Sequence, residues 1–194
     1  MRILVVYAHP VETSFIAALH RRAVETLRAG GHGVDDLDLY AERFDPVMPR
    51  EQFAHYVDTA VNTREVEPYV RRLRAAEALV LVFPVWFDGL PAMMQGYFQR
   101  VFLPGVALKI DESGLFHPNL HNLKRMAAVC TYGESRRDVA AKNNPALRFV
   151  RDNIGALIDP KGRFEYLAHY DMNFSTAARR AAFMRRITRA FEKW

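Results

Sequence analysis

The chain has 194 residues, half of them apolar, and it carries 27 lysine and arginine residues against 22 aspartate and glutamate residues. This length suits one domain with a substantial core, so we expect residues 1–194 to form a single domain. The single cysteine excludes an intrachain disulfide and a thiolate zinc cluster. A net charge of only +5, without a nucleic-acid motif, does not predict binding to DNA or RNA.

The sequence also shows no membrane-span or export signal. No apolar run approaches the length that a membrane span needs, and the first residues show no signal-peptide cleavage pattern. We therefore expect a cytoplasmic protein that is not embedded in a membrane. Its slight excess of basic residues favours a small phosphorylated or acidic partner.

The first forty residues predict a β-α-β unit. Ile3 to Tyr7 is an apolar run of strand length, and a helix follows with Thr13 or Ser14 as its N-cap. Apolar residues recur at helical spacing until Gly30 ends the helix. Gly33 to Tyr40 alternates leucine with aspartate, which predicts a strand with one wetter face.

The middle of the chain contains the most apolar strand. Residues 41–62 hold turn-forming prolines and several aromatics, and we assign them no firm secondary structure. A helix is predicted over 65–77. Ala78 to Phe83 lacks polar alternation, as a central parallel strand does, and Pro84 is expected to end its ladder. Pro91 suits the first turn of the helix that follows.

The last third repeats the alternation of strands and helices. Its predicted elements are a long loop over 106–122, a strand over 125–132, a helix over 145–158, a strand over 164–170, and a helix from Ser175 or Thr176 to about Lys193. Cys130 lies in the apolar run of one of these strands and is expected in the core.

This order predicts an α/β fold: a doubly wound five-stranded parallel sheet, strand order 2-1-3-4-5, with helices on both faces. The loops Ala8–Phe15, Pro84–Asp88 and Thr131–Ser135 follow strands one, three and four. In that strand order these strands are neighbours, and ligands bind at the carboxyl edge that the loops share.

The residues of these loops suit a flavin nucleotide. Trp86 and Phe87 would form an aromatic shelf, with plugging the end of the core as the alternative. Thr13 and Ser14 at a helix start would favour a phosphate, with simple capping as the alternative. His9 could equally be a structural histidine. No Gly-x-Gly-x-x-Gly follows the first strand, so Rossmann-type dinucleotide binding is not expected.

Two other patterns have simpler explanations. His117 and His121 stand four residues apart, but the proline between them argues against a shared helical face, and no metal site is expected. The arginines of the last helix are best explained as a solvated face, with contact to a cofactor phosphate as the alternative.

Several motifs in chain order resemble one family. They are Tyr7-Ala8-His9-Pro10 with Thr13-Ser14-Phe15, Leu39-Tyr40 with Phe44-Asp45-Pro46, Phe83-Pro84-Val85-Trp86-Phe87 with Leu90-Pro91-Ala92-Met93, Gly96-Tyr97-Phe98-Gln99-Arg100-Val101-Phe102, Pro104-Gly105-Val106-Ala107, and Thr131-Tyr132-Gly133. Over nearly its whole length the chain resembles the flavodoxin-like NAD(P)H:quinone oxidoreductases. It looks closest to their short bacterial members, including the modulator-of-drug-activity type.

The resemblance implies a homodimeric flavoprotein that carries a hydride from NADPH or NADH, through FAD or FMN, to a quinone or similar acceptor. It assigns the ribityl and phosphate end to His9, Thr13, Ser14 and Phe15, the isoalloxazine to Pro84, Val85, Trp86 and Phe87, and the pyrimidine side to Thr131, Tyr132 and Gly133. The catalytic residues stay unknown, with Trp86 and Tyr132 as candidates. An ancillary, regulatory subunit of a potassium-efflux transporter is the alternative function.

The chain departs from the animal relatives at two places. Glu134 stands where those relatives have a second glycine, and no residue of 135–144 matches their substrate-assisting tyrosine and histidine. Their C-terminal extension is not part of this sequence, so both FMN and FAD remain open.

Overall fold

A computed structural model describes all residues, 1–194, and its centre is a five-stranded parallel sheet of order β2-β1-β3-β6-β7. This is the predicted order 2-1-3-4-5, because β6 and β7 are the fourth and fifth strands of the sheet. The strands are β1 (Arg2–Tyr7), β2 (Gly33–Asp38), β3 (Ala78–Val85), β6 (Arg125–Tyr132) and β7 (Arg163–His169).

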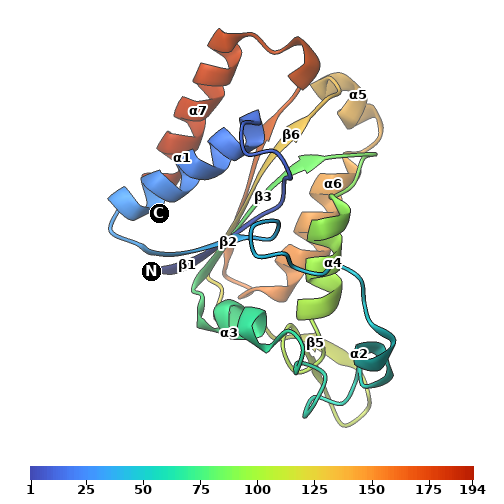
Figure 1. Cartoon of the computed structure of the whole chain (residues 1–194). Helices are drawn as coiled ribbons and strands as arrows, with labels where there is room; N and C mark the ends of the chain where they lie inside the picture. Colours follow the sequence, from blue (N-terminus) through green and yellow to red (C-terminus); the bar gives the residue numbers. More distant parts are fainter.

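Helices cover both faces of the sheet (Figure 1). The long helices α1 (Phe15–Ala29) and α7 (Ala177–Phe191) cover one face, and α3 (Glu67–Ala75), α4 (Ala92–Val101) and α6 (Pro145–Arg148) cover the other. Two short helices, α2 (Arg50–Ala54) and α5 (Arg136–Ala141), lie outside this arrangement. No helix is long and apolar enough to pass through a bilayer.

The core follows from the alternation of side chains along the central strands. Leu79 and Leu81 of β3 contribute to one buried cluster, whereas Val80 and Val82 contribute to the cluster beneath α1 and α7. Every residue of β3 is buried, which explains why its sequence shows no polar alternation. Cys130 is fully buried, as predicted.

One prediction at the end of β3 was wrong. The strand does not end before Pro84 but continues through Val85, and Pro84 lies in register with Thr131 of β6. A proline is tolerated there because its nitrogen, like that of Val82 two residues earlier, faces β1, and the pairing of β1 with β3 ends at Val82, so no ladder hydrogen bond is lost.

The predicted loop over 106–122 contains a small antiparallel hairpin, β4 (Leu108–Ile110) and β5 (Phe116–Pro118). Asp111 creates its turn: one carboxylate oxygen accepts the backbone N–H groups of Ser113 and Leu115, at 2.9 and 3.0 Å. The other carboxylate oxygen lies 2.6 Å from His117 Nε2. The sequence pattern missed the hairpin because its strands are short and exposed, without the alternation that marks a buried strand.

The predicted helix over 145–158 is interrupted. After α6 the chain forms a π-helical turn, Phe149–Ile154, and then a 3₁₀ turn, Gly155–Leu157. A π turn inserts an extra residue into the helical repeat, which apolar periodicity does not reveal. The segment starts at Asn144, whose side-chain oxygen accepts the Leu147 N–H at 3.1 Å.

Residues 41–62, for which no firm structure was expected, are fixed mainly by a buried arginine of α4. Arg100 donates to Gln52 Oε1 at 2.9 Å, to the Asp45 carbonyl at 2.7 Å and to Glu65 at 2.8 Å. A buried charge with this many partners is costly to disrupt. The segment therefore has one defined position on α4 although it is mostly turns.

Candidate functional site

The first loop of the site ends at the start of α1. Ser14 caps the helix, with its Oγ accepting the Ala17 N–H at 3.2 Å. No hydrogen bond within the protein uses the backbone N–H groups of Phe15 and Ile16. Free N–H groups in a helix's first turn, together with its dipole, favour an anion.

His9 has a structural contact in the same loop. Its Nδ1 accepts the Val11 N–H at 3.0 Å, which holds the loop in place. The His9 ring also lies 5.9 Å from the Trp86 ring, centroid to centroid. His9 therefore joins the loop after β1 to the loop after β3.

The second loop is a strained two-residue hairpin. Trp86 and Gly89 exchange backbone hydrogen bonds of 3.0 and 2.9 Å, and between them Phe87 and Asp88 have φ angles of 49° and 61°. Positive φ at both central positions is the pattern of a type I′ turn, which usually contains Asn-Gly. A phenylalanine in this conformation costs about 1–2 kcal/mol. Trp86 is 42% exposed, and Phe87 is fully exposed.

The third loop follows β6. Thr131 and Tyr132 are buried, and the Asp171 N–H donates to the Glu134 carbonyl at 2.8 Å, which ties this loop to the chain after β7. No hydrogen bond within the protein uses the N–H groups of Gly133 and Glu134. Burial raises the pKa of the Tyr132 hydroxyl, so it stays protonated at neutral pH.

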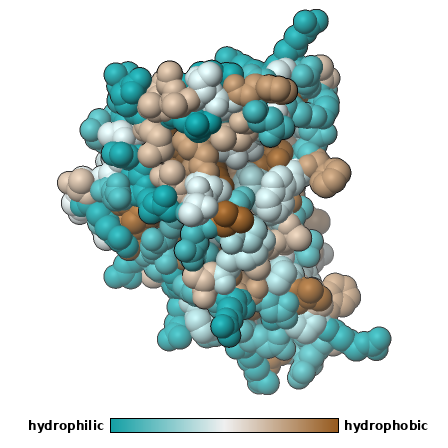
Figure 2. All heavy atoms as spheres, turned by 45° about the horizontal axis from the view of Figure 1, so that its top comes forward, coloured by the Kyte–Doolittle hydropathy of each residue, from teal (hydrophilic) through white to brown (hydrophobic).

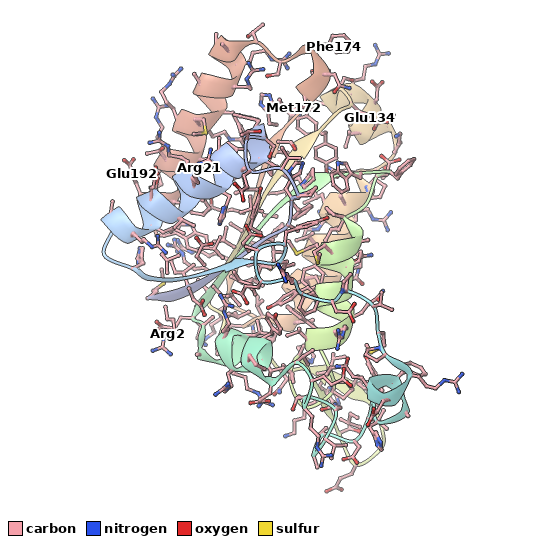
Figure 3. The ribbon with its side chains drawn as sticks, in the orientation of Figure 1. Arg2, Arg21, Glu134, Met172, Phe174 and Glu192 are labelled. Atoms are coloured by element: carbon pink, nitrogen blue, oxygen red, sulfur yellow. The ribbon has the colours of Figure 1, made fainter.

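The three loops enclose a cavity of about 710 Å³ at the carboxyl edge of the sheet. Figure 3 shows Glu134 and Met172 at this edge, with Arg2 at the opposite end of the sheet. In Figure 2, which turns the edge toward the viewer, brown apolar atoms lie among teal hydrophilic ones. The volume is that of an ordinary small-molecule site.

The structure brings together every residue predicted to bind a cofactor except Thr13. Those that line the cavity are His9, Ser14, Phe15, Pro84, Val85, Trp86, Phe87, Thr131, Tyr132 and Gly133. Thr13 is exposed and does not line it, because Ser14 rather than Thr13 is the N-cap.

Six further residues line the cavity and were not named as cofactor-binding residues: Ile16, Asp88, Glu134, Lys142, Met172 and Asn173. Met172 and Asn173 follow β7, so the same strand-end argument could have found them. Lys142 has no such signal, because it lies just after α5 and reaches the cavity through its long side chain. Its ammonium bonds both Asp88 and Glu134.

The sequence pattern of one family, described as having a flavodoxin-like fold, matches residues 1–156. The chain belongs to the flavodoxin-like fold family. This confirms the resemblance that the loop motifs indicated.

Two curated relatives of this flavodoxin-like protein are NAD(P)H oxidoreductases by name. It is 34% identical over 122 residues to NAD(P)H dehydrogenase [quinone] 1 of Rattus norvegicus, an alignment that covers 55% of this chain and 44% of the relative. It is 37% identical over 111 residues to the uncharacterised NAD(P)H oxidoreductase YcaK of Escherichia coli strain K12, which covers 55% of each. The chain thus spans about half the length of these relatives.

Solved structures share the whole fold at lower identity. An NAD(P)H:quinone oxidoreductase from Methanothermobacter marburgensis superposes with a TM-score of 0.84 at 20% identity, over 99% of this chain and 98% of the other. An FMN-dependent NADH-azoreductase from Bacillus anthracis, in complex with FMN, superposes with a TM-score of 0.78 at 13% identity, over 99% and 98%. At these identities the comparison shows only that the flavodoxin-like protein and these structures share a fold.

Proposed function

We propose that this protein is a flavin-dependent NAD(P)H oxidoreductase that reduces a quinone or a similar aromatic acceptor. The observation that carries the proposal is the cavity at the carboxyl edge of the sheet. It combines an aromatic wall, at Trp86 and Phe87, with unpaired backbone N–H groups at the start of α1. The quinone dehydrogenase relatives support the same reaction class.

The residues present fit FMN or FAD. The N–H groups of Phe15 and Ile16 would hold a phosphate, Trp86 and Phe87 would lie against the ring system, and the N–H groups of Gly133 and Glu134 would meet a ring edge that gains negative charge on reduction. A bound flavin would accept a hydride from a reduced nicotinamide and pass it to the acceptor, so that with one proton from solvent a quinone becomes a hydroquinone.

We also propose a homodimer. Apolar side chains are exposed on the segments around α2 and on the β4–β5 hairpin: Phe53, Val57, Leu115 and Phe116. Covering these side chains with a second copy would remove an apolar surface from water. Sedimentation at micromolar concentration would then give the mass of a dimer, and a monomer would contradict the proposal.

Flavin binding tests the assignment of the cavity, and the two tryptophans of the chain give a matched pair of variants. Trp86 lines the cavity, whereas Trp194 packs on Phe191 and near Arg125 at the end of the chain. Trp86→Ala should weaken FMN or FAD binding by roughly tenfold, because a ring contact of about 1.5 kcal/mol is lost. Trp194→Ala should leave the dissociation constant unchanged. Equal affinities of Trp86→Ala and the parent protein would refute the aromatic wall.

A further inference from the structure

A cluster of three charged side chains spans the rim of the cavity. Lys142 Nζ lies 2.9 and 3.0 Å from the two carboxylate oxygens of Asp88, and 2.6 and 2.9 Å from those of Glu134. Asp88 belongs to the loop after β3 and Glu134 to the loop after β6. Lys142 therefore connects two of the three loops that enclose the cavity.

The cluster dominates the charge of the cavity wall. Asp88, Glu134 and Lys142 are the only aspartate, glutamate, lysine or arginine residues among those that line the cavity. The hydrogen bonds that Lys142 donates to Glu134 and Asp88 raise the pKa of Lys142, so it is cationic at neutral pH. Two carboxylates and one ammonium leave a net charge of −1 at the rim.

The three side chains are in partial contact with water, with exposures of 40% for Lys142, 33% for Asp88 and 45% for Glu134. A ligand entering the cavity would meet their charges before it is enclosed. Charges at the mouth of a low-dielectric cleft act on approaching charged ligands and are weakened by salt.

We propose that Asp88, Glu134 and Lys142 select the acceptor by its charge, so that neutral aromatic acceptors are favoured over anionic ones. This selection rests on the proposed function, because it concerns the acceptor of that reaction. Lys142 sets the net charge of the rim, because it neutralises one of the two carboxylates. Its ammonium also holds both carboxylates at the rim. The backbone of Asp88 is held in the two-residue turn that the Trp86–Gly89 hydrogen bonds close.

Two variants separate the charge from the structural contacts. Lys142→Gln changes the rim charge from −1 to −2, and the double variant Asp88→Asn with Glu134→Gln changes it to +1. Both remove the same ion pairs. If the role is purely structural, both variants should therefore change the preference between anionic and neutral acceptors in the same direction. If the cluster selects by charge, the two variants should change that preference in opposite directions.

The probes are a matched pair of quinones, anthraquinone-2-sulfonate and the neutral 2-(hydroxymethyl)anthraquinone. Their dissociation constants are measured by calorimetric titration of the flavin-loaded protein without reductant, and their kcat/KM values are measured with NADH or NADPH. The preference for the anionic over the neutral probe should fall roughly threefold in Lys142→Gln and rise roughly tenfold in the double variant. In 1 M salt, the change in preference should become smaller for both variants.

Lys124 provides a control at the amino edge of the sheet, where its Nζ bonds Asp159 at 2.5 Å. Lys124→Gln removes one positive charge and one ion pair outside the cavity, and it should leave the preference unchanged. A preference that is equal in all variants, or that moves in the same direction in both rim variants, would overturn the selection. A protein that discriminates between the probes in the titration but oxidises no NADH or NADPH would refute the proposed function, and only the charge preference in ligand binding would remain.

Discussion

The hydroxyl of Tyr132 donates to the side-chain oxygen of Asn144 across 2.7 Å, and it also contacts the hydroxyl of Tyr166. Asn144 has a positive φ of 43° and uses the same oxygen to cap α6. Tyr132 thus lines the cavity with a ring whose hydroxyl is already bonded inside the protein. We therefore expect Tyr132 to act as a wall residue rather than as a proton donor to an acceptor.

Tyr132→Phe tests that role. The variant should retain kcat to within about threefold, because a general acid would be worth roughly 10²-fold or more. It should lose about 1 kcal/mol of unfolding free energy, since Asn144 and Tyr166 each lose a partner. Steady-state kinetics and urea unfolding measure the two effects. A hundredfold loss of kcat with unchanged stability would identify Tyr132 as catalytic.

Phe87→Gly should separate stability from cofactor affinity. The substitution relieves the strained φ of 49°, and the fully exposed ring contributes no burial that could be lost. Unfolding free energy of the flavin-free protein should rise by roughly 0.5–1 kcal/mol, because strain relief outweighs the greater chain entropy of glycine. Flavin affinity should fall. Phe87→Ala is the control, since it removes the ring but keeps the strain; equal stability of the two variants would contradict the account.

Gly96→Ala should damage the packing of residues 41–62 on α4. A methyl group at Gly96 would lie 2.2 Å from the Pro46 carbonyl oxygen and 2.4 Å from its Cα, so backbone has to move. The expected loss of unfolding free energy is about 3 kcal/mol or more. Gly114→Ala serves as control, with open space around it and a φ of 84°, and should lose only about 1 kcal/mol. Denaturant unfolding compares them; similar losses would show that the contact with Pro46 is unimportant.

His169 should make the fold sensitive to mild acid. Burial, aided by the charges of Arg179 and Arg180, lowers its pKa from the ordinary value of 6.5, and its Nε2 lies 2.7 Å from Ser175 Oγ. As pH falls below about 6.5 the unfolded chain binds a proton that the folded protein resists, so stability is lost until pH drops below the folded-state pKa. His169→Gln should flatten this decline in urea unfolding between pH 7 and 5. Parallel pH profiles would show that His169 does not contribute.

Cys130 should resist thiol reagents in the folded protein. It is fully buried, and burial raises its thiol pKa to about 12. The reactive thiolate is therefore scarce, and the reagent has no path to it. A disulfide reagent should label it in guanidinium but at a rate limited by opening in native buffer. Rapid stoichiometric labelling of the native protein would contradict its placement in β6.

The sheet could be predicted from the sequence because its strands have simple patterns. β3 and β6 are continuous apolar runs, and strands that alternate with helices leave few possible orders. The three loops of the cavity followed from that order, since parallel strands share one carboxyl edge. The hairpin after α4 and the interrupted helix after Asn144 were missed, because turn chemistry at Asp111 and an inserted π-helical residue leave no periodic signal.

The lining of the cavity was predictable where a residue ends a strand or directly follows one. Trp86 and Tyr132 are examples. Lys142 was missed because its side chain reaches the cavity from the end of a short helix, and only the three-dimensional position shows that it bonds Asp88 and Glu134. Likewise, the choice of Ser14 over Thr13 as N-cap depends on the direction of the helix, which the two adjacent hydroxyl residues leave open.

The most direct test of the proposed function is the absorbance of the flavin-reconstituted protein under anaerobic conditions. NADPH or NADH is added first, and the neutral quinone is added after the reduced nicotinamide is consumed. The account predicts that the visible flavin bands bleach with one reduced nicotinamide per flavin and return with one quinone per flavin, because each half-reaction moves two electrons. A protein that binds no flavin, or whose bound flavin keeps its oxidised spectrum in excess NADPH and NADH, would contradict it.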